Sequence, residues 1–294
     1  MLKRLPFLCA ALLALAACSH DNNTGDAAQP AAPTASSSVA TTPAAASTAP
    51  ASAMTANAPA AAASAATTTD NTPPANAAPA VAAAPFVDDG KWVEGKDYVR
   101  IEPAQPKLTG TSKIEVVEVF SYGCPACNAY HGTMNAMVKE MPSDAVVAFL
   151  PASFMPQENW VTLQRAYLTA QVFGAADKAN DAMYAAVWDT RELSSENPNG
   201  GGLKPREALP TIEDMAKIYA KFGVDPKEFV ATASSFTINT KMKRADELVK
   251  AYGVEGTPTL IIDGKYRVNP LKLGDLSKSI ALTKWLVSKE AAGK

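Results

Sequence analysis

The sequence predicts an α/β domain that carries an inserted helical block. An apolar strand at residues 114–120 runs directly into a helix, and a second apolar strand follows at 145–150. About a hundred residues of helical signal come next. A strand pair at 259–268 and a final helix then close the chain. Strands in two groups with helices between them indicate one sheet interrupted by a helical insertion.

The N-terminus has the layout of a secretory signal. Lys3 and Arg4 precede an apolar run at residues 5–17, which is too short to span a bilayer. The run ends Leu15-Ala16-Ala17-Cys18, which resembles the lipobox of bacterial lipoproteins. We therefore predict a signal peptide at 1–17, which directs export, and a lipidated Cys18 that tethers the protein to a membrane. An ordinary signal cut at a small residue is the alternative.

Residues 18–85 are predicted to be a disordered tether. Between residues 21 and 84 there is no aromatic residue, no Lys and no Arg, and the composition is dominated by Ala, Pro, Thr and Ser. Such a segment cannot bury enough apolar surface to fold, and its prolines interrupt any helix. As a flexible coil it would have an end-to-end distance of roughly 45 Å.

Residues 86–294 are long enough for one domain with a substantial core, and this is the simplest domain count. The formal net charge of the chain is −2, so no excess of basic residues indicates nucleic-acid binding.

The first half of this domain predicts a βαβ unit. Strands are expected at 98–101 and 114–120, and a third at 145–150. The helix between them begins after Cys124 and stops at Pro142. Its apolar face is formed by residues at helical spacing: Tyr130, Met134, Met137 and Met141.

The predicted helical insertion covers about residues 155–252. Two of its helices have clear starts, because Thr211 and Asp225 are capping residues and each is followed three positions later by an acidic residue. The glycine run at 200–202 predicts a loop, and the last insertion helix is expected to end at Gly253.

The chain closes with a predicted hairpin and helix. Residues 259–262 and 265–268 are strand candidates joined by Asp263-Gly264, a dipeptide typical of tight hairpin turns. A final helix is expected at about 275–289.

The pair Cys124-Pro125-Ala126-Cys127 predicts a redox site. Pro125 suits the first position of a helix, so Cys124 lies where unpaired N–H groups and the positive end of the helix dipole favour a thiolate. We therefore expect Cys124 to be the exposed nucleophile and Cys127 to be the resolving cysteine. Cys9 falls within the signal peptide and Cys18 is assigned to the lipid, so only the pair can form a redox-active disulfide.

Two motifs together carry a family resemblance. Phe120-Ser121-Tyr122-Gly123-Cys124-Pro125-Ala126-Cys127, followed far downstream by Gly253-Val254-Glu255-Gly256-Thr257-Pro258-Thr259, resembles the DsbA-type thiol:disulfide oxidoreductases of the thioredoxin superfamily. The resemblance implies a thioredoxin-like fold with an inserted helical domain. It also implies a cis peptide bond before Pro258, facing the cysteines. Substrate would then bind along Thr257, Pro258, Pro125 and Ala126.

Three further positions near the motif matter for its chemistry. Glu118 matches the family's buried acid and is a candidate proton relay, whereas the alternative is a surface-facing strand residue like Glu115. Ala126 departs from the family, whose typical member has a histidine there that stabilises the thiolate. His131 is poorly placed to replace that histidine, and we expect it on the helix surface.

The resemblance implies a periplasmic protein that donates its Cys124–Cys127 disulfide to newly exported proteins. It further implies reoxidation by a quinone-linked membrane protein of the DsbB type, with no cofactor and no metal. A disulfide reductase or isomerase of the same fold is the alternative. A copper-binding module using Cys124, Cys127 and His131 with a methionine is a weaker alternative, because methionines at helical spacing more often belong to a core.

Overall fold

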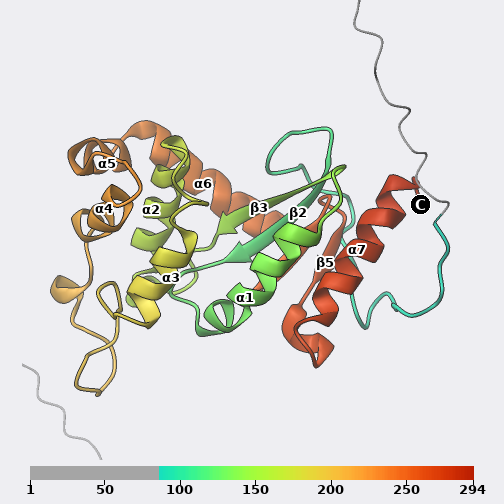
Figure 1. Cartoon of the computed structure of the whole chain (residues 1–294), viewed down its shortest axis with the longest axis horizontal. Coiled ribbons are helices and arrows are strands. Elements are labelled where there is room, and N and C mark those ends of the chain that lie inside the picture. Colours follow the sequence, from blue (N-terminus) through green and yellow to red (C-terminus); the bar gives the residue numbers. More distant parts are fainter. Residues whose placement is uncertain (1–85) are drawn as a thin grey trace, which may run out of the picture. The chain divides into compact units, whose positions relative to one another are not determined.

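The computed structural model describes residues 86–294, which fold around a five-stranded sheet with the strand order β1-β5-β4-β2-β3 (Figure 1). The predicted signal peptide, Cys18 and the tether lie outside the described residues. The strands are β1 (Val99–Arg100), β2 (Ile114–Phe120), β3 (Ala145–Pro151), β4 (Thr259–Ile262) and β5 (Tyr266–Val268). The helices are α1 (Pro125–Glu140), α2 (Trp160–Val172), α3 (Asn180–Trp188), α4 (Ile212–Ala220), α5 (Pro226–Ala233), α6 (Phe236–Ala251) and α7 (Lys278–Ala291). Three short 3₁₀ helices are η1 (Pro156–Glu158), η2 (Arg206–Ala208) and η3 (Pro270–Leu273).

The central strand β2 pairs with β3 in parallel and with β4 in the antiparallel sense. The predicted βαβ unit is therefore confirmed, with α1 as its crossover. The predicted hairpin joins β4 to β5, and both Asp263 and Gly264 have positive φ. The Lys265 N–H donates to the Ile262 carbonyl at 2.9 Å, which closes the turn.

Helices cover both faces of the sheet. On one face α1 and α7 lie side by side, and their apolar residues pack on Val116 of β2 (Figure 1). On the other face, Val117 packs in the core cluster to which α6 contributes Ala245 and Leu248. Within residues 86–294, no helix is long and apolar enough to cross a membrane.

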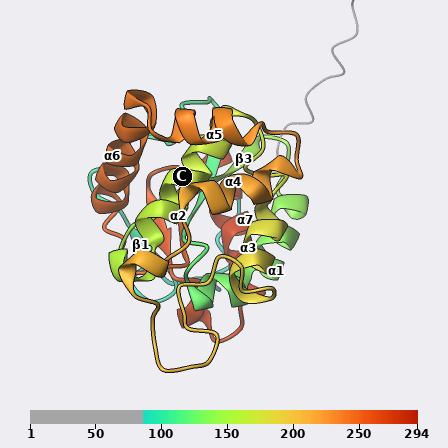
Figure 2. The same ribbon diagram turned by 90° about the vertical axis from the view of Figure 1, so that its left-hand side faces the viewer.

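Between β3 and β4 the chain forms helices α2 to α6, which lie within residues 160–251 and are joined by loops (Figure 2). Thr211 and Asp214 form a reciprocal capping box at the start of α4, and the Asp225 side chain accepts from two backbone N–H groups of α5. The predicted helix starts at these two residues are confirmed. Gly200 to Gly202 lie in the long loop between α3 and α4, where all three have positive φ.

The last helix begins later than predicted. Residues 270–273 form the 3₁₀ helix η3, and α7 starts only at Lys278 instead of near Asp275. The Asp275 carboxylate accepts from the backbone N–H of Ser277 at 2.9 Å and from its hydroxyl at 2.8 Å. These local bonds hold a turn before the helix, because aspartate competes well for nearby backbone donors.

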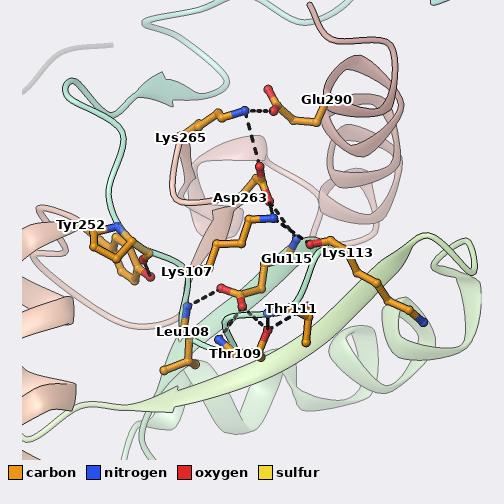
Figure 3. A network of polar contacts seen from close by, with 11 residues as sticks. Lys107, Leu108, Thr109, Thr111, Lys113, Glu115, Tyr252, Asp263, Lys265 and Glu290 are labelled. Carbon is orange, nitrogen blue, oxygen red and sulfur yellow. Dashed lines mark hydrogen bonds and ion pairs between the residues drawn. The ribbon is translucent and has the colours of Figure 1, made fainter.

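Glu115 was expected to face the surface, and this expectation is wrong. Its exposed fraction is 0%, and its carboxylate accepts from the backbone N–H groups of Leu108 and Thr109 and from the Thr109 hydroxyl (Figure 3). The segment before β2 therefore folds over the sheet and covers this side chain. Nearby, Lys107 pairs with Asp263 at 2.7 Å, so the β4–β5 turn is tied to the same segment.

Candidate active site

The two cysteines lie at the start of α1, directly after the central strand. Cys124 is the N-cap residue, with extended backbone, and Pro125 occupies the first helical position. The Cys127 N–H points back at the Cys124 sulfur at 3.3 Å. The sulfur also lies 3.4 Å from the Thr257 carbonyl oxygen. Both cysteines are thiols in this structure.

Cys124 is less exposed than the sequence suggested. Its exposed fraction is 4%, compared with 0% for Cys127. The order of accessibility follows the prediction, whereas the expectation of an exposed Cys124 is wrong. The loop that carries Thr257 lies over the sulfur and shields it, so a partner thiol reaches Cys124 only from a restricted direction.

The two thiols have opposite acidities. Hydrogen bonding from the Cys127 thiol is the largest influence that lowers the pKa of Cys124 to about 6, and the backbone N–H groups of Cys127 and Ala126 add to it, while burial opposes it. Burial raises the pKa of Cys127 well above its usual range, and the neighbouring Cys124 and Glu118 reinforce this. At neutral pH the pair therefore holds one thiolate, on Cys124.

Glu118 lies on β2 within the core, with an exposed fraction of 2%. One of its carboxylate oxygens, Oε1, has no hydrogen-bond partner in the part of the chain that the structure describes. Burial raises the pKa of Glu118 to about 8, and the charge on Cys124 contributes as well. Glu118 is thus a protonated acid at neutral pH, close enough to both cysteines for their charges to interact.

The predicted substrate-binding residues gather around Cys124. The Thr257–Pro258 peptide bond is cis, as the resemblance implies. Pro258 is buried, whereas Pro125 is exposed and Ala126 is half-buried. A cavity of about 190 Å³ opens beside Pro125 and is lined also by Gly123, Leu163 and Trp188.

His131 lies at the junction of α1 with α3 and is more buried than predicted. Its side chain is 16% exposed, its ring lies tilted against that of Tyr184 with centroids 4.2 Å apart, and it pairs with Asp181 at 2.7 Å. The Nε2 atom of the His131 ring therefore faces the Asp181 carboxylate. Within residues 86–294, no group of three or more His, Cys, Asp or Glu side chains is placed to hold a metal ion.

Aromatic residues around the turn before Cys124 escaped the sequence analysis. Tyr122 is 1% exposed and its ring contacts those of Phe120, Tyr167 and Tyr184 at centroid distances of 5.1, 6.2 and 5.0 Å. Tyr167 and Tyr184 come from the insertion, so only the tertiary structure brings them to the site. In the sequence, this aromatic cluster was indicated only by the position of Tyr122 next to the cysteine motif.

This arrangement can exchange a disulfide. A stabilised thiolate on Cys124 is a good nucleophile and a good leaving group, and Cys127 is within reach to form or resolve a bond with it. The protonated Glu118 can hold or give up a proton near Cys127 without solvent access.

Comparisons with known proteins agree with this chemistry. The family model described as "Thioredoxin" matches residues 109–281. The chain is 32% identical over 201 residues to the thiol:disulfide interchange protein DsbA of Pseudomonas aeruginosa, covering 68% of this chain and 87% of that protein. It is 33% identical over 220 residues to the DsbA of Pseudomonas syringae pv. tomato, covering 74% of this chain and 94% of that protein.

Solved structures show the same similarity. The crystal structure of Pseudomonas aeruginosa DsbA superimposes with a TM-score of 0.58 and 31% identity, covering 70% of this chain and 97% of that chain. The oxidoreductase DsbA of Xylella fastidiosa gives a TM-score of 0.58 and 30% identity, covering 68% of this chain and 98% of that chain. The predicted fold class, a thioredoxin-like fold with inserted helices, is confirmed.

Proposed function

Because this chain belongs to the DsbA-type thiol:disulfide oxidoreductases of the thioredoxin superfamily, we propose that Cys124 and Cys127 form its redox-active disulfide and that it donates this disulfide to exported proteins. The observation that supports this assignment best is the contrast in acidity between the two thiols. The pKa of Cys124 is lowered to about 6, while that of Cys127 is raised.

The reaction begins with the oxidised protein. A thiolate of the substrate attacks the Cys124 sulfur, the Cys124–Cys127 bond breaks, and its electron pair leaves on Cys127, which takes up a proton. A second substrate thiolate then attacks the substrate sulfur of the mixed disulfide, and Cys124 leaves as a thiolate. Two substrate thiols are thereby oxidised to one disulfide, and the two cysteines of the protein are reduced.

Cys124 serves as the leaving group of the second step. Thiols of low pKa leave faster, and a stabilised Cys124 thiolate favours the reduced product over the disulfide. The helix N-terminus and the N–H of Cys127 thus drive the exchange toward oxidation of the substrate.

We assign Glu118 as the proton relay for Cys127. The departing Cys127 thiolate is buried and needs a proton, because an unpaired charge in the core is costly. Glu118 is protonated at neutral pH, and its charge state influences the pKa of Cys127. Proton transfer from Glu118 to Cys127 would move that charge onto the Glu118 carboxylate, which bears it more easily because the pKa of Glu118, about 8, lies below the raised pKa of Cys127.

Substrate is proposed to bind as an extended segment along Thr257 and Pro258, with Pro125 and Ala126 on the opposite side of the sulfur. The Thr257 carbonyl already points at Cys124, so backbone pairing beside it would bring a substrate cysteine to the sulfur. Pro125 is exposed and offers an apolar contact next to the reacting atoms.

The site of action follows from the family and from the N-terminal sequence. We place the protein in the periplasm, with reoxidation by a DsbB-type quinone-linked membrane protein, and we assign Cys18 as its lipid anchor. Residues 18–85 would let the domain reach substrates at a distance from the membrane.

A disulfide reductase or isomerase is the second candidate, and Ala126 is the observation that favours it. A methyl group in place of the family's histidine gives no side-chain stabilisation to the thiolate, which weakens the oxidant.

A transfer experiment tests the function. Oxidised protein is mixed with a reduced, unfolded protein that contains two thiols, and the thiols of both partners are counted by mass after acid quenching. We expect the substrate to lose two thiols for each pair gained by Cys124 and Cys127. A Cys124→Ser variant serves as the control. Absence of transfer from the wild-type protein would reject disulfide donation.

A further inference from the structure

The turn that leads into Cys124 is held from two sides. Ser121 to Cys124 form a tight turn in which the Cys124 N–H donates to the Ser121 carbonyl at 3.1 Å. Its central peptide joins Tyr122 to Gly123. The N–H of that peptide, on Gly123, donates to the Ser121 hydroxyl at 3.2 Å, and its carbonyl, on Tyr122, accepts from the indole N–H of Trp188 at 2.8 Å.

Without these two bonds the central peptide would be free to turn over. A glycine at the third position of a tight turn permits both orientations of this peptide, because the flipped form requires a positive φ that glycine adopts easily. Gly123 does not have a positive φ here. Turning the peptide over would break both the Ser121 and the Trp188 hydrogen bonds.

The glycine is required by packing. A Cβ atom at Gly123 would lie 2.7 Å from Nε1 and 2.8 Å from Cδ1 of Trp160, on helix α2. Trp160 thus excludes a side chain at this position, which leaves the turn its freedom to flip. Trp160 cannot itself hold the peptide, since its Nε1 has no hydrogen-bond partner among residues 86–294.

Trp188 supplies the restraint from the insertion. It is the last residue of α3 and is half-buried, and its donor reaches a carbonyl of the residue two positions before Cys124. Tyr122 is 1% exposed, so losing this donor would leave its buried carbonyl without a partner among residues 86–294.

We propose that Trp188 is a positioning residue, which holds the Tyr122 carbonyl and thereby fixes the turn that places the Cys124 sulfur against the Cys127 N–H and the Thr257 carbonyl. The proposal rests on the proposed function in taking Cys124 as the reacting sulfur. It gives the helical insertion a direct part in the chemistry of the thioredoxin-like domain.

The test replaces Trp188 by Phe, which keeps an aromatic ring and removes the N–H donor. The matched control is Trp285→Phe, in α7, where the indole N–H has no hydrogen-bond partner within the described residues. Iodoacetamide alkylation of the reduced full-length protein is followed across pH 4–9, with circular dichroism and thermal unfolding to verify folding.

We expect Trp188→Phe to raise the midpoint of Cys124 alkylation by about 0.5 to 1 pH unit, as loss of one hydrogen bond allows. Alkylation at pH 5, below the wild-type midpoint, should then slow by roughly three- to tenfold, whereas at pH 7 it should slow by less than about twofold. Trp285→Phe should leave both values unchanged. A Trp188→Phe protein that folds and retains the wild-type midpoint would overturn the proposal.

If Trp188→Phe does not fold, Ser121→Ala removes the other hydrogen bond of the same peptide and should shift the alkylation midpoint in the same direction. An unchanged midpoint in Ser121→Ala would count against the proposal.

Disulfide donation is measured separately on the wild-type protein. If the wild-type protein does not donate its disulfide but the alkylation midpoint of the variant is shifted, the proposed function is rejected and the positioning role is kept. If the wild-type protein donates its disulfide and the midpoint of the variant is unchanged, only the positioning role is rejected.

Discussion

The sulfur of Cys124 lies 3.4 Å from the carbonyl oxygen of Thr257, a residue 133 positions further along the chain. This contact joins the two motifs that define the site. It also explains why Cys124 is almost buried although it begins a helix, because the loop before Pro258 lies over it. The reactivity of Cys124 therefore depends on acidity and on a restricted approach more than on exposure.

Alkylation of the reduced protein should label Cys124 before Cys127, with a midpoint near pH 6. The thiolate reacts and the thiol does not, and the pKa of Cys124 is lowered to about 6 whereas that of Cys127 is raised. Peptide mass spectrometry after brief exposure to iodoacetamide at several pH values measures this. Faster labelling of Cys127 would contradict the assignment of the nucleophile.

Two substitutions of Cys127 should separate its hydrogen bond from its redox role. Hydrogen bonding from the Cys127 thiol is the main influence lowering the pKa of Cys124. Cys127→Ala removes this donor and should raise the alkylation midpoint by about 1 pH unit, whereas Cys127→Ser keeps a donor and should change it less. Both variants should accumulate mixed disulfides with substrate through Cys124. Equal midpoints in the two variants would exclude the hydrogen bond as the cause.

Glu118→Gln should stabilise the folded domain at neutral pH and slow its chemistry. The folded pKa of Glu118 is about 8, against an ordinary value of 4.5, so wild-type stability falls as the pH rises from about 4.5 to 8. The stability of Glu118→Gln does not fall over this pH range, because the amide does not ionise. The variant should therefore be more stable than the wild-type protein by about 3 kcal/mol at pH 7, with little difference at pH 4. Reduction of its disulfide by substrate should slow roughly tenfold or more.

Urea unfolding of the oxidised form, in which no thiol titrates, measures the part of this difference that burial of Glu118 causes, because the charge on Cys124 is absent there. Glu115→Gln is the matched control, from the same strand and the opposite face. Its carboxylate accepts three hydrogen bonds, so the amide should destabilise the domain by about 1 to 3 kcal/mol without affecting disulfide exchange. A destabilised Glu118→Gln protein at pH 7 would contradict the raised pKa.

The contrast between these two glutamates shows what the sequence could predict. Alternation along β2 places them on opposite faces, and this is correct. The sequence gives no sign that the segment around Thr109 folds over Glu115, because that contact depends on how the chain before β2 is held by Asp263. Local patterns predicted strands, caps and the hairpin, since each of these depends on neighbouring residues.

Apart from Tyr122, the residues missed at the site lie on the insertion. Trp188 and Tyr184 reach the turn before Cys124 only when α3 packs beside it. Their spacing along α3 is that of any buried helical face, so nothing local distinguishes a residue that touches the active site from one that fills the core. His131 was misjudged for the same reason, because its partner Asp181 belongs to α3.

The reduction potential should lie between roughly −190 and −250 mV. The family's strong oxidant combines a cysteine pKa near 3.5 with a potential near −120 mV, and thioredoxin combines about 7 with −270 mV. For a cysteine pKa below 7, each unit by which the pKa decreases raises the potential by about 30 mV, and the pKa of Cys124 is about 6. Equilibration with glutathione buffers measures the potential, and a value near −120 mV would contradict this reasoning.

Ala126→His should raise that potential by about 30 mV or more, since a histidine beside Cys124 restores the side-chain stabilisation typical of the family. Ala129→His is the matched control, because Ala129 is exposed on the same helix outside the cysteine pair. Equal potentials in the two variants would show that the side chain at 126 does not reach the thiolate.

The oxidised and reduced forms should exchange their order of stability between about pH 7 and 8. A disulfide that closes a loop of four residues stabilises the folded state by roughly 2 kcal/mol in the chain-entropy model. Lowering the Cys124 pKa from its ordinary value to about 6 stabilises the reduced form by about 1.5 kcal/mol at pH 7. A depressed pKa stabilises the folded state fully above the unfolded value and loses its effect as the pH falls through 6.

The reduced form should therefore be the less stable one at pH 6 and the more stable one at pH 8. Above about pH 8.5 the raised pKa of Cys127 works against the reduced form, because its thiol ionises more easily in the unfolded chain. Urea unfolding of both forms between pH 5.5 and 8.5 tests the crossing. A reduced form that stays more stable down to pH 6 would mean that the Cys124 pKa lies near 4, as in a strong oxidant, and an oxidised form more stable throughout would place it near that of thioredoxin.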